Sequence, residues 1–279
     1  MNISMNNDYV RQDGDPLPEL QAIAAAGFTR IQWIHHWGDD FVYHDSEIEQ
    51  IARWLAELKL TLIDLHATSG REKQWTSTKP WARAAGIELV RNRIAMTRRL
   101  GGNTIVMHLQ RQDEADTIEA CAARLRRTFD TLLGDLERHD MRIALENLFT
   151  LGGNKPLLDR VLSEIDSPRL GVCYDSGHGC MIGDGFDFLR EHGDRLFSVH
   201  LHDNNGKDDQ HALPFTGKVD WPQAMKLIGQ SAYDGPLTLE VGKRPGNWEG
   251  DEASFLAAAM KCAERLKRLV EAGLADRGA

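Results

Sequence analysis

Eight short runs of β-branched and apolar residues recur along the chain, bounded by Gly, Asp or Asn. Such runs are typical of buried strands, and they lie at residues 1–5, 29–34, 60–66, 103–108, 141–146, 169–175, 196–201 and 236–241. Amphipathic segments with helical spacing separate them, and several begin with Asp, Ser or Pro and end with Gly. With no Pro/Gly/Ser-rich linker in its 279 residues, the chain is predicted to be an α/β protein forming a single (β/α)8 barrel domain over 1–279. A doubly wound sheet is the alternative.

Composition narrows the functional classes. No apolar run approaches the roughly 20 residues of a membrane span, and the N-terminal MNISMNNDYV lacks the basic and apolar regions of a signal peptide. We therefore expect a cytoplasmic protein with no membrane partner. The four cysteines show no CxxC spacing, which favours reduced thiols over a disulfide framework. A formal net charge of −9 argues against a nucleic-acid partner and favours a small polar or cationic one.

Alternation along the strands predicts which side chains face the barrel interior. In LFSVH, residues 196–200, Phe197 and Val199 are expected to pack on the helices while Ser198 and His200 point inward. The last inward residues of six successive strands are His66, His108, Glu146, Asp175, His200 and Glu240. Active sites of (β/α)8 barrels lie at the carboxyl ends of the strands. These six side chains are therefore predicted to meet at one mouth.

Three of these six residues are carboxylates, which would repel one another and lose hydration if buried together. The sequence places no Lys or Arg at the same strand ends. A divalent metal ion is the simplest counter-charge. Mixed imidazole and carboxylate ligands without sulfur suit Mn, Zn, Co or Mg, and the imidazoles favour Mn or Zn.

Several motifs resemble those of the xylose-isomerase-like TIM barrels, a superfamily of sugar isomerases and epimerases, dehydratases and an apurinic-site endonuclease. They are ALEN (144–147), GVCYDSGH (171–178), VHLHDNNG (199–206), GKVDW (217–221) and LTLEV (237–241). The resemblance covers most of the chain and is strongest over 141–241. It implies a metal site formed by Glu146, Asp175, His200 and Glu240. Further ligands of the endonuclease branch match His66, His108, His178, Asp209 and His211, which would bind either a second metal or substrate hydroxyls.

Two features favour the sugar enzymes over the endonuclease. The HDNNG turn followed by GKVDW resembles the sugar branch, whereas the endonuclease usually has Asn at the position of His202. The acidic chain also lacks the basic surface that phosphate-backbone binding requires. We expect a metal-dependent isomerase or epimerase of a sugar or sugar phosphate, so that the partner is a small carbohydrate. His202 is a further candidate for a second metal or for substrate.

Three other functions stay open at this point. One is a metal-dependent dehydratase or lyase acting on a cyclic polyol or a keto-acid. Another is a phosphodiesterase resembling the apurinic-site endonuclease. The third is a non-catalytic metal-binding protein.

The expected chemistry is proton transfer beside a carbonyl group. A metal would polarise the carbonyl oxygen while a carboxylate removes the proton from the adjacent carbon. Glu146 and Glu240 are the expected catalytic pair, one abstracting and the other returning the proton through a metal-held cis-enediolate. Return to the neighbouring carbon isomerises the sugar, and return to the opposite face of the same carbon epimerises it.

Side chains beyond the strand ends supply weaker candidates for substrate binding. Trp33 lies at the end of the second strand, and His36 and Trp37 follow it, where a pocket wall would stand. Trp75 lies in a polar segment after the third strand and is a candidate for a lid. Lys207 could bind a phosphate group. Ordinary core packing or solvated loop charges would account for the same residues, and a homo-oligomer stays open.

Overall fold

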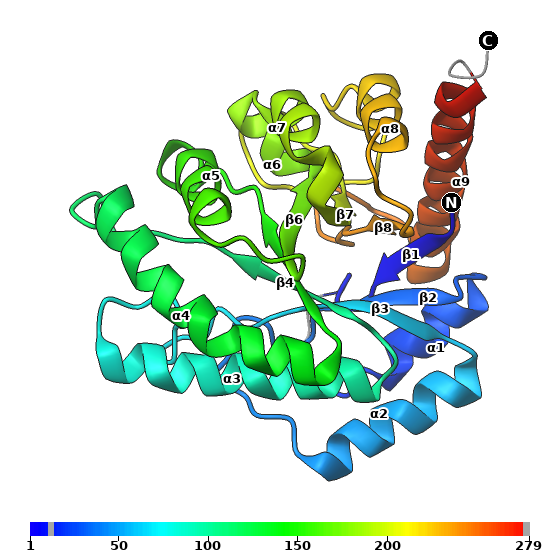
Figure 1. Cartoon of the computed structure of the whole chain (residues 1–279). Coiled ribbons are helices and arrows are strands. Elements are labelled where there is room, and N and C mark those ends of the chain that lie inside the picture. The colour runs from blue at the N-terminus through cyan, green and yellow to red at the C-terminus, as the bar shows by residue number, and fades with distance from the viewer. Residues whose placement is uncertain (11–13, 276–279) are drawn as a thin grey trace.

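The computed structural model describes residues 1–10 and 14–275, and within these ranges eight parallel strands close into a barrel. They follow one another around the barrel in chain order (Figure 1). The strands are β1 (Ile3–Asn6), β2 (Arg30–Trp33), β3 (Thr61–His66), β4 (Thr104–His108), β5 (Arg142–Glu146), β6 (Leu170–Asp175), β7 (Leu196–Leu201) and β8 (Leu237–Leu239). Each overlaps a predicted strand. The predicted (β/α)8 barrel is confirmed, and the doubly wound sheet is excluded.

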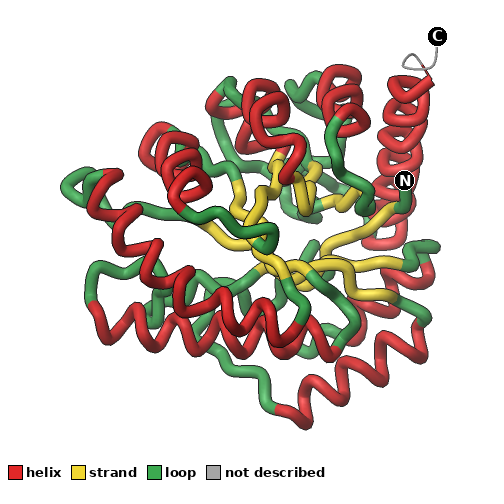
Figure 2. The backbone as a smooth tube through the Cα atoms, in the orientation of Figure 1, coloured by secondary structure: helices red, strands yellow, loops and turns green. Residues whose placement is uncertain are grey.

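Helices surround the strands on the outside, as the tube in Figure 2 shows. They are α1 (Leu17–Ala25), α2 (Asp45–Leu58), α3 (Pro80–Arg99), α4 (Ile118–His139), α5 (Lys155–Glu164), α6 (Ser176–Ile182), α7 (Gly185–His192), α8 (Trp221–Gln230) and α9 (Glu252–Ala275). Their amphipathic spacing explains how they dock: α2, for example, buries Ile48, Ile51 and Leu55 on one face. Among the helices in 1–10 and 14–275, none has the length and apolar character that crossing a membrane requires.

Helix α6 follows β6 without an intervening loop. Its sequence, SGHGCMI, contains two glycines, which weaken a helical pattern. The helix begins because the side chain of Asp175 accepts a hydrogen bond, 2.7 Å long, from the backbone N–H of His178. Glycine at 179 lets α6 approach α7, since a Cβ there would lie 2.7 Å from the Cα of Gly185. His178 is therefore fixed in the first helical turn beside Asp175.

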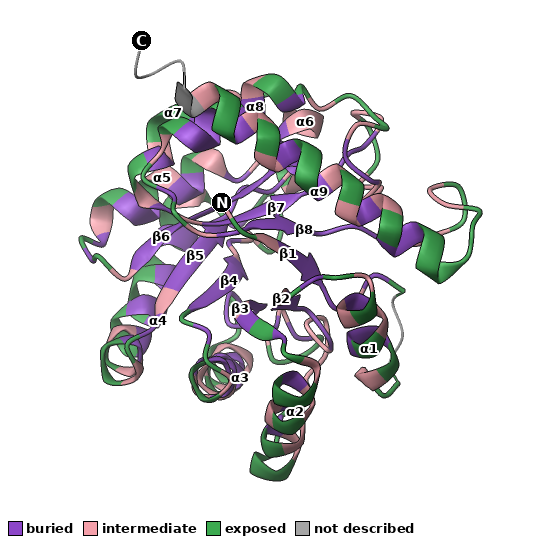
Figure 3. Ribbon diagram, turned by 90° about the vertical axis from the view of Figure 1, so that its right-hand side faces the viewer, coloured by how far each residue is buried: buried purple, intermediate pink, exposed green. Residues whose placement is uncertain are grey.

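The apolar core has two parts. The larger part fills the space between strands and helices, and buried residues accordingly dominate the strands in Figure 3. A smaller cluster, formed by Val106, Ala144 and Cys173, lies inside the barrel. Each of these three residues stands two positions before a strand-end residue named above. Because side chains alternate with period two, this small apolar cluster forms the floor beneath the polar mouth.

Phe197 does not pack on the helices as predicted. The β6–β7 register shifts here: Val172 pairs with Leu196, but Cys173 pairs with Ser198, which leaves Phe197 unpaired in a bulge. Its ring packs against the inner apolar cluster and lies over Gly171, where a Cβ would come within 2.5 Å of it. The strict alternation fails at this one residue, while Val199 and His200 keep their predicted faces.

Candidate active site

The six strand-end residues converge because their strands are neighbours and their registers match. His108 is the register partner of Glu146, and Asp175 is the register partner of His200. Glu240 directly follows β8, and its backbone N–H donates to Leu201 on β7. Strands β3 to β8 therefore present all six side chains at the carboxyl end of the barrel.

Four of these residues form a compact donor set. Glu146, Asp175, His200 and Glu240 are at most 6% exposed. Each offers one ligand atom, and all four atoms lie within 4.8 Å of one another. The Nδ1 atom of His200 is buried and lies 2.8 Å from a Glu240 oxygen and 3.2 Å from a Glu146 oxygen. It makes no hydrogen bond within the described part of the chain. A buried imidazole nitrogen that lies close to two carboxylates without a hydrogen bond to either fits a divalent metal ion.

The histidines of the site shift the pKa values of the two glutamates in this set. Burial by itself raises the pKa of Glu146, but His200 and His108 outweigh it and hold that pKa well below its usual value. Burial is likewise outweighed at Glu240, where His200 lowers the pKa to about 2. The pKa of His200 is raised well above its usual value despite burial, by Cys173 and the two glutamates. Positive charge at this position therefore stabilises both carboxylates as anions.

A second group of donors lies on one side of Glu146. One of its carboxylate oxygens, Oε2, is 3.6 Å from the Nε2 atom of His66 and 3.3 Å from that of His108. These three side chains also form a group that could hold a metal ion. The ring of Trp37 stands over both histidines, with centroid distances of 4.8 Å to His66 and 5.3 Å to His108. Trp37 and the two histidines line a cavity at the mouth of the barrel.

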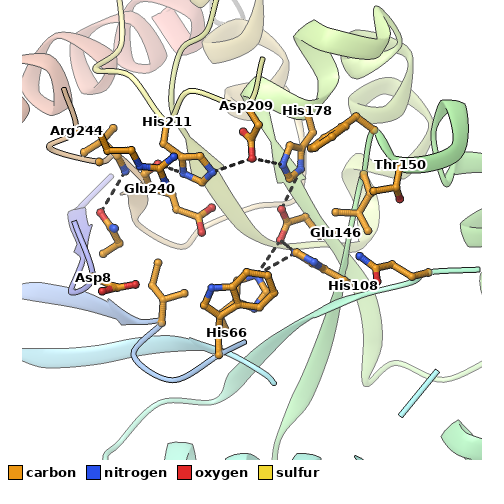
Figure 4. Close-up of a pocket in the computed structure, with 18 residues that line it drawn as sticks. Asp8, His66, His108, Glu146, Thr150, His178, Asp209, His211, Glu240 and Arg244 are labelled. Atoms are coloured by element: carbon orange, nitrogen blue, oxygen red, sulfur yellow. Dashed lines mark hydrogen bonds and ion pairs between the residues drawn. The ribbon is translucent and has the colours of Figure 1, made fainter. Parts of the chain in front are cut away.

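The network continues on the other side of Glu146, as Figure 4 shows. His178 Nδ1 lies 3.2 Å from a Glu146 oxygen, and its Nε2 lies 3.7 Å from Asp209. Asp209 in turn contacts His211 at 3.1 Å. Burial would raise the pKa of Asp209, but His178 and His211 hold it far below its usual value. Asp209 and His211 come from the β7–α8 loop, so this loop completes the mouth.

His202 has a different position from the other histidines. It is fully buried, its Nε2 atom lies 3.1 Å from the Asp175 carboxylate, and its ring is stacked on His211 at 4.2 Å. It does not line the cavity. Together with Asp209 and His211 it forms another donor group. Its contact with Asp175 restricts how that carboxylate can turn.

Gly177 makes room for the His202 ring, and this predicts a stability effect. A Cβ at position 177 would lie 2.0 Å from His202 Cε1. Because the ring is enclosed, Gly177→Ala must displace it and disturb its contact with Asp175. Overpacking of this kind costs about 1–3 kcal/mol, so we expect the free energy of unfolding, measured by urea titration, to fall by that amount. Gly134→Ala is the control, because Gly134 is an exposed position of α4 with nothing within 4 Å of an added Cβ. Equal stability of both variants would contradict the prediction.

Four of the weaker candidates lie away from this cavity. Trp33 is buried, donates a 3.0 Å hydrogen bond from Nε1 to the hydroxyl of Tyr43, and sits on the outer face of β2. Trp75 is buried in the core, with its ring 5.8 Å from that of Phe129. The remaining two are loop residues: His36 lies 3.2 Å from Asp39, and Lys207 is exposed.

Other residues line the cavity without having been identified from the sequence. The cavity measures about 180 Å³, and the unpredicted part of its lining includes Asp8, Gln110, Phe149, Thr150 and Arg244. Asp8 and Arg244 follow β1 and β8, the two strands that close the barrel beside Glu240. Their positions one short loop beyond these strand ends are the only signal that could have indicated them.

Comparisons with known proteins agree with this architecture. The family model described as "Xylose isomerase-like TIM barrel" matches residues 20–261. An uncharacterized protein, y4fM, of Sinorhizobium fredii (strain NBRC 101917 / NGR234) is 33% identical over 285 residues, covering 93% of this chain and 91% of that protein.

Solved structures with the same fold are more distant in sequence. A D-tagatose 3-epimerase-like protein matches with a TM-score of 0.80 and 19% identity, covering 100% of both chains. A D-psicose 3-epimerase, crystallised in the presence of D-fructose, matches with a TM-score of 0.77 and 17% identity, covering 97% of this chain and 99% of that one. These solved structures show that the fold is shared. The family model, in contrast, matches the amino-acid sequence. The chain belongs to the xylose isomerase-like TIM barrel family.

Proposed function

We propose that this protein is a metal-dependent isomerase or epimerase of a sugar or sugar phosphate. The observation that carries the proposal is the placement of two glutamates, Glu146 and Glu240, on either side of His200 Nδ1 at the base of the cavity. Two carboxylates at one small cavity are what proton abstraction and return require. The similarity in fold to sugar epimerases supports the same reaction class.

Glu146, Asp175, His200 and Glu240 would hold the metal ion. Their oxygen and nitrogen donors fit Mn or Zn better than a sulfur-preferring ion. When bound, the metal would polarise a substrate carbonyl and favour the charge that develops on its oxygen. Asp175 is held in place by His202 and by its N-cap contact with His178, and it does not line the cavity, so we assign it to metal binding rather than to proton transfer.

The glutamates differ from Asp175 because both line the cavity. Each carboxylate is kept anionic by neighbouring histidines, as its lowered pKa indicates. Either one can accept a proton from a carbon atom placed above it, and the other can return one. Transfer to the same carbon from the opposite face gives an epimer, while transfer to the adjacent carbon gives an isomer.

The cavity lining suits a small carbohydrate. His66, His108 and Asp209 offer hydrogen-bonding atoms to hydroxyl groups, and the rings of Trp37 and Phe149 offer apolar surfaces to the faces of a sugar. The chain's net charge of −9 gives no support for binding a nucleic acid backbone.

A panel of ketoses and their phosphates would test this function. Metal-loaded protein is incubated with each compound, and the mixture is followed by NMR and mass spectrometry. We expect a new sugar of unchanged mass from at least one member. Loss of one water molecule would identify a dehydratase instead. Binding of a sugar without any product in the whole panel would favour a non-catalytic protein.

A phosphodiesterase is the second candidate, because the donor atoms fall into more than one group. Besides the main set, His66, His108 and Glu146 form one group, and His202, Asp209 and His211 form another. Anomalous scattering from crystals grown with Zn would count the ions. One ion per chain favours the sugar enzyme. Several ions, together with cleavage of DNA containing an abasic site, would favour the phosphodiesterase.

A further inference from the structure

Two buried polar side chains on β2 and β3 lie inside the barrel near the candidate metal ligand His200. Gln32 comes from β2, Asp64 from β3 and His200 from β7, and all three are at most 2% exposed. Gln32 and Asp64 are register partners on adjacent strands. None of the proton-transfer steps proposed above uses Gln32 or Asp64. Burying an amide and a carboxyl group is costly unless each finds partners.

The two ring nitrogens of His200 face different surroundings. Nδ1 lies close to the carboxylates of Glu146 and Glu240, within the four-residue donor set. Nε2 is in contact with the side-chain amide of Gln32. A histidine that gives its Nδ1 lone pair to a metal carries its proton on Nε2, and that N–H needs an acceptor.

The orientation of the Gln32 amide decides whether this acceptor exists. With Nε2 of Gln32 facing Nε2 of His200, two donors would meet when the metal is bound. The oxygen and nitrogen of an amide have nearly the same shape, so the opposite orientation occupies the same space. In that orientation Gln32 Oε1, which has no partner elsewhere in the described residues, accepts the hydrogen bond from His200.

The neighbouring strand, β3, carries a carboxylate oxygen that lacks a partner in the described part of the chain. Asp64 Oδ1 has no hydrogen-bond partner in the ranges that the structure describes, while Oδ2 accepts a hydrogen bond from the hydroxyl of Ser198. Asp64 is the register partner of Gln32 on the adjacent strand. The turned amide thus pairs Gln32 Oε1 with His200 Nε2.

We infer that Gln32 is a positioning residue for His200: its side-chain carbonyl accepts the Nε2–H of the imidazole and fixes the ring with Nδ1 toward the metal. The inference rests on the proposed metal site, and it names a residue that does not touch substrate. Partners of this kind typically account for 10–100-fold in metal affinity.

Zinc affinity of the metal-free protein tests this role without any assay of turnover. Affinity is measured by competition with a chromophoric chelator for the parent chain, Gln32→Met and Gln32→Glu. Met has similar size but no acceptor, so we expect about 10–100-fold weaker binding. Glu keeps an acceptor oxygen at the same place and is expected to bind within a few-fold of the parent.

Thr238→Val is the matched control for disturbing the barrel interior. Thr238 is fully buried, is the register partner of His200, and its hydroxyl has no hydrogen-bond partner among the described residues. This variant is expected to keep the parent affinity. Thermal unfolding of each metal-free variant verifies that the fold is retained.

NMR of the zinc-loaded parent gives a readout that needs no variant. Long-range ¹H–¹⁵N correlation is expected to place the His200 proton on Nε2, with the shift of a hydrogen-bonded N–H. A proton on Nδ1, or a folded Gln32→Met variant that binds zinc as the parent does, would overturn the inference while leaving the proposed function in place. A parent chain that binds no zinc or manganese would instead refute the metal site itself, and with it the inference.

Discussion

Asp175→Ala is expected to leave the purified protein without tightly bound metal. Asp175 is fully buried, belongs to the four-residue donor set, and is oriented by His202. Its loss removes one of the four ligand side chains and one of the three carboxylates whose charge a divalent ion would neutralise. Protein purified with added Mn or Zn is analysed for its metal content. We expect this content to fall from stoichiometric in the parent to a small fraction of one ion per chain in the variant.

A second substitution separates metal binding from folding. Asp175 is also the N-cap of α6, so alanine there can weaken the helix that carries His178. Asp175→Asn keeps a capping oxygen, because Asn and Asp are equally good N-caps, but removes the charge. We expect Asn to retain the fold and still lose the metal. Asp187→Ala, at an exposed position on α7, is the control and should keep it. Stoichiometric metal in both Asp175 variants would refute the assignment.

Much of the fold follows from periodicity, and the reason is physical. Each strand is buried on both faces and bounded by turn residues, so its position is marked in the sequence regardless of its partners. Successive side chains of a strand alternate between its two faces because the backbone geometry fixes this alternation. The alternation predicts an inward position for His66, His108, Glu146, Asp175 and His200. Phe197 escapes this rule because a bulge depends on the register between two strands, which no single strand encodes.

The residues around the site depend on tertiary contacts that a local pattern does not contain. Trp75 follows a site strand in a polar segment, yet it is buried because Gly86 on α3 lets its backbone pack against the helix: a Cβ on Gly86 would lie 2.3 Å from the Trp75 nitrogen. Gln32 is an ordinary inward residue of β2, and only the closed barrel brings it to His200. Arg244 lies in a loop after β8 and reaches the cavity, but no local sequence pattern indicates the path of this loop.

Glu146→Gln and Glu240→Gln are each expected to reduce turnover of the ketose that the panel identifies by at least about 10²-fold. A positioned acid–base group contributes typically about 10² to 10⁴ in rate, and Gln keeps the size and one oxygen of the side chain while removing its capacity to take a proton. Both residues line the cavity and are close to His200, so both meet the geometric requirement. Steady-state kinetics at saturating metal is the measurement, and Glu57→Gln, at an exposed position on α2, is the control.

Deuterium exchange assigns the direction of transfer between the two glutamates. If Glu146 and Glu240 act on opposite faces of one carbon, each epimer has its hydrogen removed by a different glutamate. In deuterated water, a variant that lacks the abstracting base for one epimer no longer washes out that epimer's hydrogen, but it still exchanges the hydrogen of the other. We therefore expect the two Gln variants to show opposite exchange patterns when each epimer is supplied separately. Metal content is measured on the same samples, because a variant that has lost its metal would stop both exchanges together. Metal-loaded Gln variants that turn over at the parent rate would exclude both residues as bases, since an amide cannot replace a carboxylate in accepting the proton.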